Sequence, residues 1–184
     1  MKRNSKGFTL VELIVSVAIM GLIALIAMGF MTTGARTYTA VGYTLRLQYE
    51  SQLAMAQLQD AMMDCNTGIV WDGSTLSILN TDSQNPDNDE LKLFRYDSAE
   101  QCIYYGSNSP HAATLLAEDL LAEHVSAFSV SFRPGAETNH VKLADLELTF
   151  QRRSKTHTGS QSVALRNQPL TAASVSDLLD AVYP

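Results

Sequence analysis

Glu12 is the one charged residue in an otherwise apolar segment that runs from Phe8 to Met31. A carboxylate buried at the centre of an apolar membrane helix costs on the order of 2.5–3.5 kcal/mol on insertion scales, so an acid that enters apolar surroundings calls for a partner cation. Cleavage of the chain between Gly7 and Phe8 would create that cation. The new α-amino group of Phe8 would stand four residues before Glu12, on the same helix face. In a packed assembly, the amine of one copy could equally meet the acid of its neighbour.

A short basic leader precedes this segment and contains Lys2, Arg3 and Lys6. The uninterrupted apolar part, Leu13 to Met31, has nineteen residues. At ~1.5 Å per residue it is about 28 Å long, which is enough to cross the hydrocarbon core of a membrane. Leader cations before a span favour a cytoplasmic N-terminus. We therefore expect a single-pass membrane protein whose chain lies outside the cytoplasm from about residue 35 onward.

The run Gly7-Phe8-Thr9-Leu10-Val11-Glu12-Leu13 resembles the processing and methylation site of type IV prepilins and type II secretion pseudopilins. The resemblance implies that a prepilin peptidase of the bacterial cytoplasmic membrane removes the leader after Gly7, and that the amine of Phe8 is then methylated. It also implies that the apolar helix packs into the core of a filament, where Glu12 meets an N-terminal amine. The partners implied are the prepilin peptidase and other pilins or pseudopilins.

Two other readings of the N-terminus remain open at this point. An ordinary secretory signal peptide is cleaved after its apolar region, whereas here the candidate small residue, Gly7, precedes an apolar region that is long for that role. An uncleaved anchor carrying an extracytoplasmic binding module would explain the leader and the span but would leave Glu12 without a purpose. Sequencing of the N-terminus in assembled material separates the two outcomes.

Length and charge suggest one anchored domain. We expect a leader at 1–7, a transmembrane and filament-core helix at 8–31, an exported helix continuation at 32–65 and a sheet domain at 66–184. The formal net charge is −6, and loss of the three leader cations makes it more negative. An acidic exterior disfavours direct nucleic-acid binding, which needs basic patches. The one basic cluster, Arg152-Arg153-Lys155, reads as a solvated loop.

Residues 44–65 carry an apolar stripe with helical spacing. Met55, Leu58, Met62 and Cys65 follow one another at steps of three, four and three residues, which predicts a buried helix face. The preceding part is weaker, because glycine and threonine are poor residues for a helix interior. The stripe is therefore expected to carry a sheet.

Past Cys65 the pattern changes to short strands and turns, so the fold class is predicted as α+β. The resemblance makes this fold pilin-like, with a long N-terminal helix packed on an antiparallel sheet. A bulge is expected near Ala144-Asp145 in the strand from Val141 to Phe150. The expected elements are strands at 69–71, 76–79, 91–96, 101–105, 125–132, 141–150 and 163–165, with short helices at 115–122 and 176–183.

Two later runs resemble the J-type group of minor pseudopilins and the minor pilins of type IV pili and Gram-positive competence systems. They extend from Leu121 to Phe132 and from Val163 to Asn167. Components of this kind are proposed to sit at the filament tip and to start assembly, so the resemblance implies such a place for this chain. Whether the machine secretes proteins, takes up DNA or builds an adhesive pilus stays open.

Cys65 and Cys102 fall in the exported part, where disulfides persist in an oxidising compartment. A bridge would close a loop of 38 residues and contribute about 3–4 kcal/mol in the chain-entropy model. Two free thiols are the alternative, and both stay open. A metal site needs more ligands than these two cysteines.

Catalysis finds little support in the sequence. No phosphate-binding loop, nucleophile elbow or zinc-protease pattern occurs, and the four histidines are scattered. An exported enzyme is kept only as a competitor that would show activity from about residue 36 onward. The acidic loop from Asp82 to Glu90 offers oxygen ligands for calcium but lacks EF-hand spacing, so a solvated loop is preferred. We therefore expect a non-enzyme without a cofactor or metal.

Overall fold

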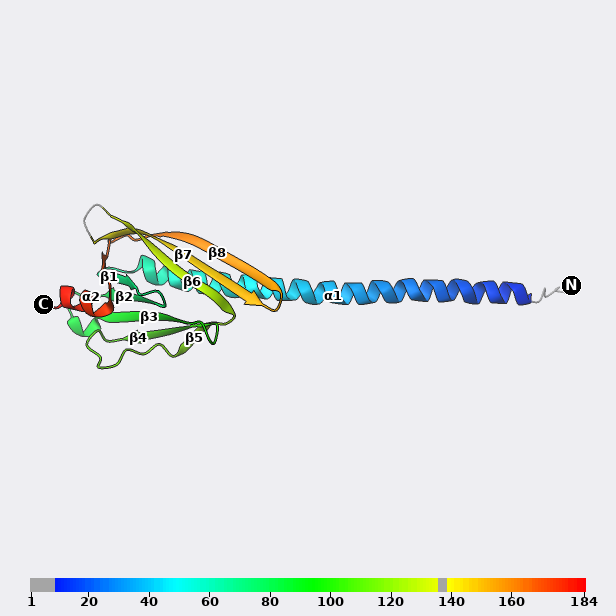
Figure 1. Cartoon of the computed structure of the whole chain (residues 1–184), viewed down its shortest axis with the longest axis horizontal. Coiled ribbons are helices and arrows are strands. Elements are labelled where there is room, and N and C mark those ends of the chain that lie inside the picture. Colours follow the sequence, from blue (N-terminus) through cyan, green and yellow to red (C-terminus); the bar gives the residue numbers. More distant parts are fainter. Residues whose placement is uncertain (1–8, 136–138) are drawn as a thin grey trace, which may run out of the picture. The chain divides into compact units, whose positions relative to one another are not determined.

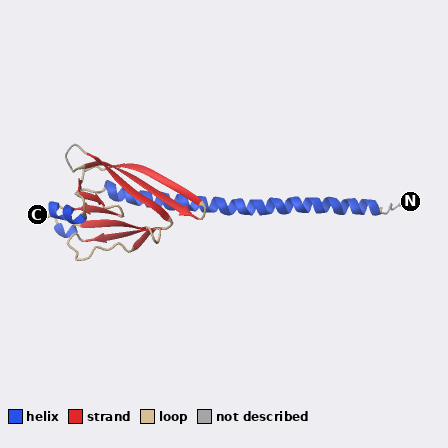
Figure 2. Ribbon diagram, viewed as in Figure 1, coloured by secondary structure: helices blue, strands red, loops and turns tan. Residues whose placement is uncertain are grey.

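The computed structural model describes residues 9–135 and 139–184, and its first element is a helix, α1, from Leu10 to Met63 (Figures 1 and 2). The expected cleavage site, Gly7 and Phe8, lies outside the described residues. The chain divides into two compact units at Tyr43 and Thr44. In the first unit every described residue up to Thr39 is exposed. Within the described chain, α1 is the only helix long and apolar enough to cross a membrane.

In the second unit, α1 buries one face. The predicted stripe is confirmed, because Met55, Leu58 and Met62 are buried and Cys65 follows them into the core. The helix itself ends at Met63, two residues before the expected boundary. The residues of α1 on the buried face are Leu47, Ser51, Ala54, Met55, Leu58, Ala61 and Met62.

Six strands form the larger sheet in the order β5-β4-β3-β2-β1-β9. All neighbours in it are antiparallel except β1 and β9, which run parallel. The strands are β1 (Gly68–Trp71), β2 (Thr75–Asn80), β3 (Glu90–Asp97), β4 (Cys102–Asn108), β5 (Asp119–Ala122) and β9 (Leu170–Thr171), and a 3₁₀ turn, η1 (Pro86–Asn88), precedes β3. The two hairpins predicted here, β1–β2 and β3–β4, are confirmed.

Aspartate side chains fix both hairpin turns. The Oδ1 atom of Asp72 accepts hydrogen bonds from the backbone amides of Ser74 at 2.8 Å and Thr75 at 2.6 Å. In the second turn, Oδ1 of Asp97 accepts from the amide of Ala99 at 3.0 Å. Aspartate favours such turns because its short side chain satisfies amides that no strand partner can reach.

The second sheet contains three antiparallel strands in the order β6-β7-β8. They are β6 (Val125–Pro134), β7 (Val141–Arg152) and β8 (Lys155–Ala164). The register of β6 and β7 skips Lys142, because Arg133 pairs with Leu143 and Pro134 with Val141. The position expected for the bulge, near Ala144-Asp145, is therefore wrong, because the bulge lies two residues earlier along the strand. The parity change that suggested it is real, but it lies at Lys142.

The larger sheet buries both faces. One face joins α1 and the smaller sheet in a core that includes Leu58, Ile78 and Phe150. The other face is covered by a loop through Ala117 and by the helix α2 (Val175–Val182), whose Leu178 is fully buried. A long helix packed on antiparallel-rich sheets confirms the α+β, pilin-like fold class.

Gly106 on β4 permits the close approach of the covering loop. A Cβ atom at this position would stand 1.9 Å from the carbonyl oxygen of Leu116 and 2.8 Å from the Cα of Ala117. Both atoms belong to the backbone, so neither can move without displacing the loop. Asn108 fixes the same loop through two 2.8 Å hydrogen bonds to the backbone of Leu116. Glycine is therefore required where this loop crosses the strand.

Two of the expected late elements are wrong. The segment 115–122 is not a short helix: residues 115–118 form an irregular loop, and Asp119–Ala122 form strand β5. The short strand expected at 163–165 is the end of a ten-residue strand, β8. Its earlier residues, from Lys155 to Ser162, include no large apolar side chain, because the positions that face inward are His157, Gly159 and Gln161, of which Gly159 and Gln161 lie against α1. The basic run Arg152-Arg153-Lys155 lies at the tight, largely exposed β7–β8 turn.

In the structure Cys65 and Cys102 are two free thiols, the alternative to the disulfide considered for them. Cys65 lies before β1 and Cys102 begins β4, so three strand spacings, about 14 Å, separate them, against the ~7 Å that a bridge tolerates. The register adds distance along the strands. Gly68 is aligned through β2 and β3 with Asn108, at the opposite end of β4 from Cys102.

Candidate functional site at the start of the long helix

Thr9 and Glu12 cap the first turn of α1. The backbone amide and the hydroxyl of Thr9 each donate to Oε2 of Glu12 at 3.0 Å. In return, the backbone amide of Glu12 donates to Oγ1 of Thr9 at 3.3 Å. The carbonyl of Thr9 accepts the first helical hydrogen bond, from the amide of Leu13 at 3.2 Å. This reciprocal arrangement is a capping box, which satisfies amides that have no partner within the helix.

The capping box leaves part of the carboxylate open. Every hydrogen bond that a described residue gives to the Glu12 side chain ends on Oε2. Among the described residues, none donates a hydrogen bond to Oε1. The carboxylate also lies at the positive end of the helix dipole, which favours its negative charge. The site can therefore hold one additional cation without breaking its internal bonds.

Thr9 is a functional residue that the reading of the sequence missed. The signal was present, because Thr9-Leu10-Val11-Glu12 fits the pattern of a threonine followed three residues later by a glutamate. Glu12 was interpreted only as the partner of a future amine. The structure gives it a second role that is already fulfilled before any cleavage. The predicted pair between Phe8 and Glu12 itself stays a prediction, since Phe8 is not described.

The two cysteines do not form a site. Burial raises the pKa of the Cys65 thiol to about 12, and its Sγ donates to the carbonyl of Gly68 at 3.3 Å. Cys102 lies at the start of β4, half-buried, and its Sγ donates to the carbonyl of Glu100 at 3.3 Å. Burial also raises the pKa of Cys102. Both thiols are thus protonated and weakly nucleophilic near neutral pH.

In the acidic loop from Asp82 to Glu90, carboxylate oxygens accept hydrogen bonds from backbone amides of the loop itself. Hydrogen bonds led by that from the backbone amide of Gln84, at 2.9 Å, hold the pKa of Asp82 below its ordinary value. Asp89 is buried and accepts from the amide of Asp82 at 2.7 Å and from the hydroxyl of Tyr183. In the part of the chain that the structure describes, no three acidic, histidine or cysteine side chains stand together as a metal-binding group. Calcium binding by this loop stays untested.

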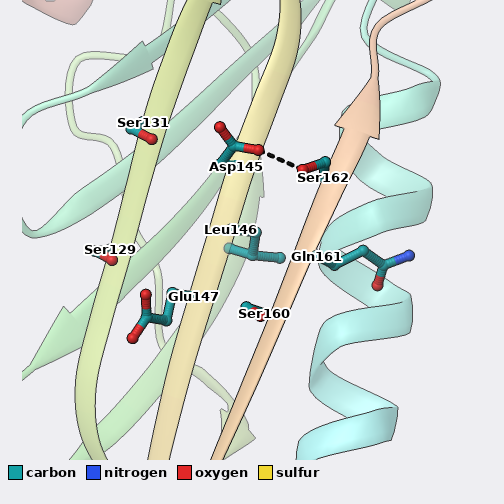
Figure 3. A pocket seen from close by; sticks show the side chains of 8 residues that line it. All are labelled: Ser129, Ser131, Asp145, Leu146, Glu147, Ser160, Gln161 and Ser162. Atoms are coloured by element: carbon teal, nitrogen blue, oxygen red, sulfur yellow. Dashed lines mark hydrogen bonds between the residues drawn. The ribbon is translucent and has the colours of Figure 1, made fainter.

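A shallow trough of about 290 Å³ crosses the outer face of the smaller sheet (Figure 3). Asp145 in its centre accepts from the Ser162 hydroxyl and from Nε of Arg133, which lies 2.6 Å away. Both contacts lower the pKa of Asp145, the serine bond most. Glu147 stands next to it on the exposed face. Serines and carboxylates on a solvated face form a hydrophilic surface, and nothing in this trough arranges a nucleophile or a ligand set. The lining residues are Ser129, Ser131, Asp145, Leu146, Glu147, Ser160, Gln161 and Ser162.

Comparison with known proteins gives one finding at the site. Residues 2–28 match the family model described as Prokaryotic N-terminal methylation motif. The match supports a precursor of the type IV pilin or pseudopilin kind that prepilin peptidase processes and whose N-terminal apolar helix anchors it in a membrane. No curated protein and no solved structure matches the chain.

Proposed function

We propose that this chain is a pilin or pseudopilin subunit that is cut between Gly7 and Phe8, methylated at Phe8 and assembled through α1 into a filament. The observation that carries the proposal is the matched motif at residues 2–28. It covers the apolar start of α1, where Glu12, in the first turn, is the only acid between Leu10 and Met31. A motif of this kind on an uncovered apolar helix is suited to packing against other helices rather than to catalysis.

The carboxylate geometry supports a specific role for Glu12. In the precursor, Oε2 is held by Thr9, and no described residue donates a hydrogen bond to Oε1. Cleavage after Gly7 would place an ammonium group on Phe8, one helical turn before Glu12. The amine of the same copy or of a neighbour then binds Oε1. Both charges are neutralised together, so the helix start can enter an apolar filament core.

The sheet domain supplies the outer surface of the subunit in this proposal. With its N-terminus in the cytoplasm, the anchored precursor presents residues 44–184 outside the cytoplasmic membrane. We further propose a minor place in the filament, at or near its tip. This finer proposal rests on the resemblance of the runs from Leu121 and from Val163, and on nothing that the fold adds. Secretion, DNA uptake and adhesion are all compatible with such a subunit.

Mass spectrometry of the mature N-terminus tests the proposal directly. A chain that starts at a methylated Phe8 is the expected result in membrane or filament fractions. Replacement of Gly7 by a bulky residue should abolish the mass shift of leader removal, while replacement of Ser5 by alanine serves as the matched control and should leave it unchanged. A protein that keeps Met1 or Lys2 in assembled material would contradict the proposal and would favour an uncleaved anchor with a binding domain.

A second measurement addresses assembly rather than processing. Glu12→Leu should insert into the membrane and lose its leader normally but should be depleted from filaments. The reason is that the Phe8 amine would then enter the apolar core without a counter-charge. Filaments are sheared from cells and the variant is quantified in the filament and membrane fractions. Normal incorporation would remove the assembly role of Glu12 even if cleavage is confirmed.

A further inference from the structure

A groove lies between α1 and the edge strand β5 in the second unit, with a volume of about 180 Å³. Its apolar walls remain in contact with solvent, because Leu53 is 46% exposed and Leu120 is 52% exposed. Apolar side chains gathered at a groove in this way favour coverage by another apolar surface. The residues that line it are Glu50, Leu53, Leu120, Leu121, Ala122 and Glu123.

The groove also has an excess of negative charge. Arg46 binds Oε1 of Glu50 through its Nε at 2.8 Å, and the field of Glu123 acts on the same guanidinium. Oε2 of Glu50 is buried and receives no hydrogen bond from any residue that the structure describes. A buried carboxylate oxygen of this kind needs a donor. Two carboxylates thus share one cation at the groove, and a second cation would balance them.

The chain itself carries a helix that meets both requirements. Along α1, Arg36 is the only lysine or arginine from Leu10 to Leu45. Gly29, Thr33 and Ala40 flank it at steps of seven, three and four residues, so they share its helix face. Small residues on that face let the helix lie close to another surface. The aliphatic part of an arginine can then lie on leucines while its guanidinium reaches a carboxylate.

We propose that this groove binds the Arg36 face of α1 from a second copy of the chain, with the guanidinium against Glu50 and Glu123. The inference rests on the proposed filament function, and it needs several copies of the chain in a row, at the tip or along the filament; it names one lateral contact between them. The two surfaces are different, so the contact is heterologous. Contacts of this type do not close into a symmetric dimer but repeat as an open chain of subunits.

Cysteine cross-linking in cells that assemble the filament tests the contact. Cys102 is replaced by serine in the full-length chain, because its half-buried thiol could react with the cross-linker. Cys65 is kept, because it is buried. Arg36→Cys and Glu123→Cys are combined in one chain and treated with a short bis-maleimide. A ladder of covalent dimers, trimers and longer products is expected, since each copy then offers both halves of the contact. Arg36→Cys with Ser131→Cys, on the outer face of the smaller sheet, is the matched control and should give no ladder.

A strain without the assembly ATPase provides the second control, and there the ladder should disappear. Absence of the ladder in assembled filaments would overturn the proposal. Cross-links that join this chain only to a different subunit, identified by peptide mass spectrometry, would overturn the second copy as the occupant. Both results leave the proposed function standing as long as the unsubstituted protein is cleaved and recovered in filaments.

Charge reversal supplies an independent readout that needs no cysteine. Arg36→Glu and Glu123→Arg should each lower filament recovery about tenfold through like charges at the contact, and the double variant should restore it. Arg166→Glu, an exposed reversal on another surface, should keep normal recovery. Equal recovery of the single variants and the parent, or a double variant worse than both single variants, would contradict the proposed pairing.

Discussion

Glu12 has two roles in the proposed function, as a helix cap and as the partner of an amine, and two substitutions separate them. Glu12→Gln keeps the capping box, because glutamine serves at this position as glutamate does, but it removes the negative charge. Thr9→Ala keeps the charge and removes the hydroxyl that bonds to Oε2 at 3.0 Å. Ser16→Ala is the control. Its hydroxyl donates to the backbone carbonyl of Glu12 at 2.7 Å and touches neither role.

The magnitudes expected for the two substitutions differ widely. Loss of an N-cap threonine costs about 1 kcal/mol, which corresponds to roughly fivefold in an equilibrium. Removal of one partner of a buried ion pair costs about 3–5 kcal/mol, because it leaves the other charge uncompensated, and this exceeds about a hundredfold. Incorporation into filaments should therefore fall at most about fivefold for Thr9→Ala, fall by about a hundredfold or more for Glu12→Gln and stay unchanged for Ser16→Ala.

Competition within one cell measures these ratios. Each variant is expressed beside an epitope-tagged parent, filaments are sheared, and the variant-to-parent ratio is compared between the filament and membrane fractions. Leader removal is followed by mass in the same samples, so that a processing defect is not mistaken for an assembly defect. Glu12→Gln incorporated as well as the parent would refute the ion-pair reasoning. Thr9→Ala as severely depleted as Glu12→Gln would show that the cap, rather than the charge, governs assembly.

Other predictions concern the sheet domain. Iodoacetamide should alkylate Cys102 before Cys65. Cys65 should react only after denaturation, because burial raises its pKa to about 12. Intact mass spectrometry measures both reactions, and equal rates would contradict the assigned burial. Gly106→Ala should destabilise the full-length protein in detergent by about 1–3 kcal/mol or more, because its Cβ would meet the backbone of the loop. In the same denaturant titration Gly42→Ala should be neutral or slightly stabilising, because its Cβ would meet no other atom within 4 Å. Leu58→Ala should cost about 2–5 kcal/mol, against little change for exposed Leu116→Ala. Backbone amides, of Gln84 at Asp82 and of Glu100 and Ala99 at Asp97, lower the pKa of these carboxyls in the folded state, so the free energy of unfolding should fall as the pH drops below about 4. Asp82→Asn should flatten that decline, and an unchanged acid limb in this variant would contradict the assignment.

The helix and the two hairpins could be predicted because their signals are local. Met55, Leu58 and Met62 repeat with the helical period, and Asp72 and Asp97 stand where each hairpin turns. Helical spacing and turn chemistry act over a few residues, so a single sequence contains them. The capping box is equally local, because Thr9 and Glu12 stand three residues apart in the sequence.

The features that the sequence did not yield depend on distant parts of the chain. The sequence from Leu115 to Ala122 looks helical. Its first part must cross Gly106, however, and a helix cannot approach a strand so closely. Strand β8 lacks apolar alternation because polar and small residues occupy its inner face. One of them, Gln161, donates a hydrogen bond to Gln59 of α1 at 2.7 Å. The cysteines could not be paired or separated before the strand order was known. Each of these outcomes is decided by tertiary packing that overrides local preference.

The order of events in the proposed pathway follows from the open oxygen of Glu12. While the leader is attached, Thr9 satisfies one carboxylate oxygen. In the proposed topology the first turn of the helix lies close to the cytoplasmic surface of the membrane. That position tolerates an exposed acid because a group near the interface keeps contact with water and headgroups. A filament core offers no such contact, so an uncleaved chain would carry an uncompensated charge into it. Cleavage supplies the missing cation at the same helix turn, and an unprocessed precursor is therefore excluded from assembly by electrostatics alone, even where its apolar helix would fit.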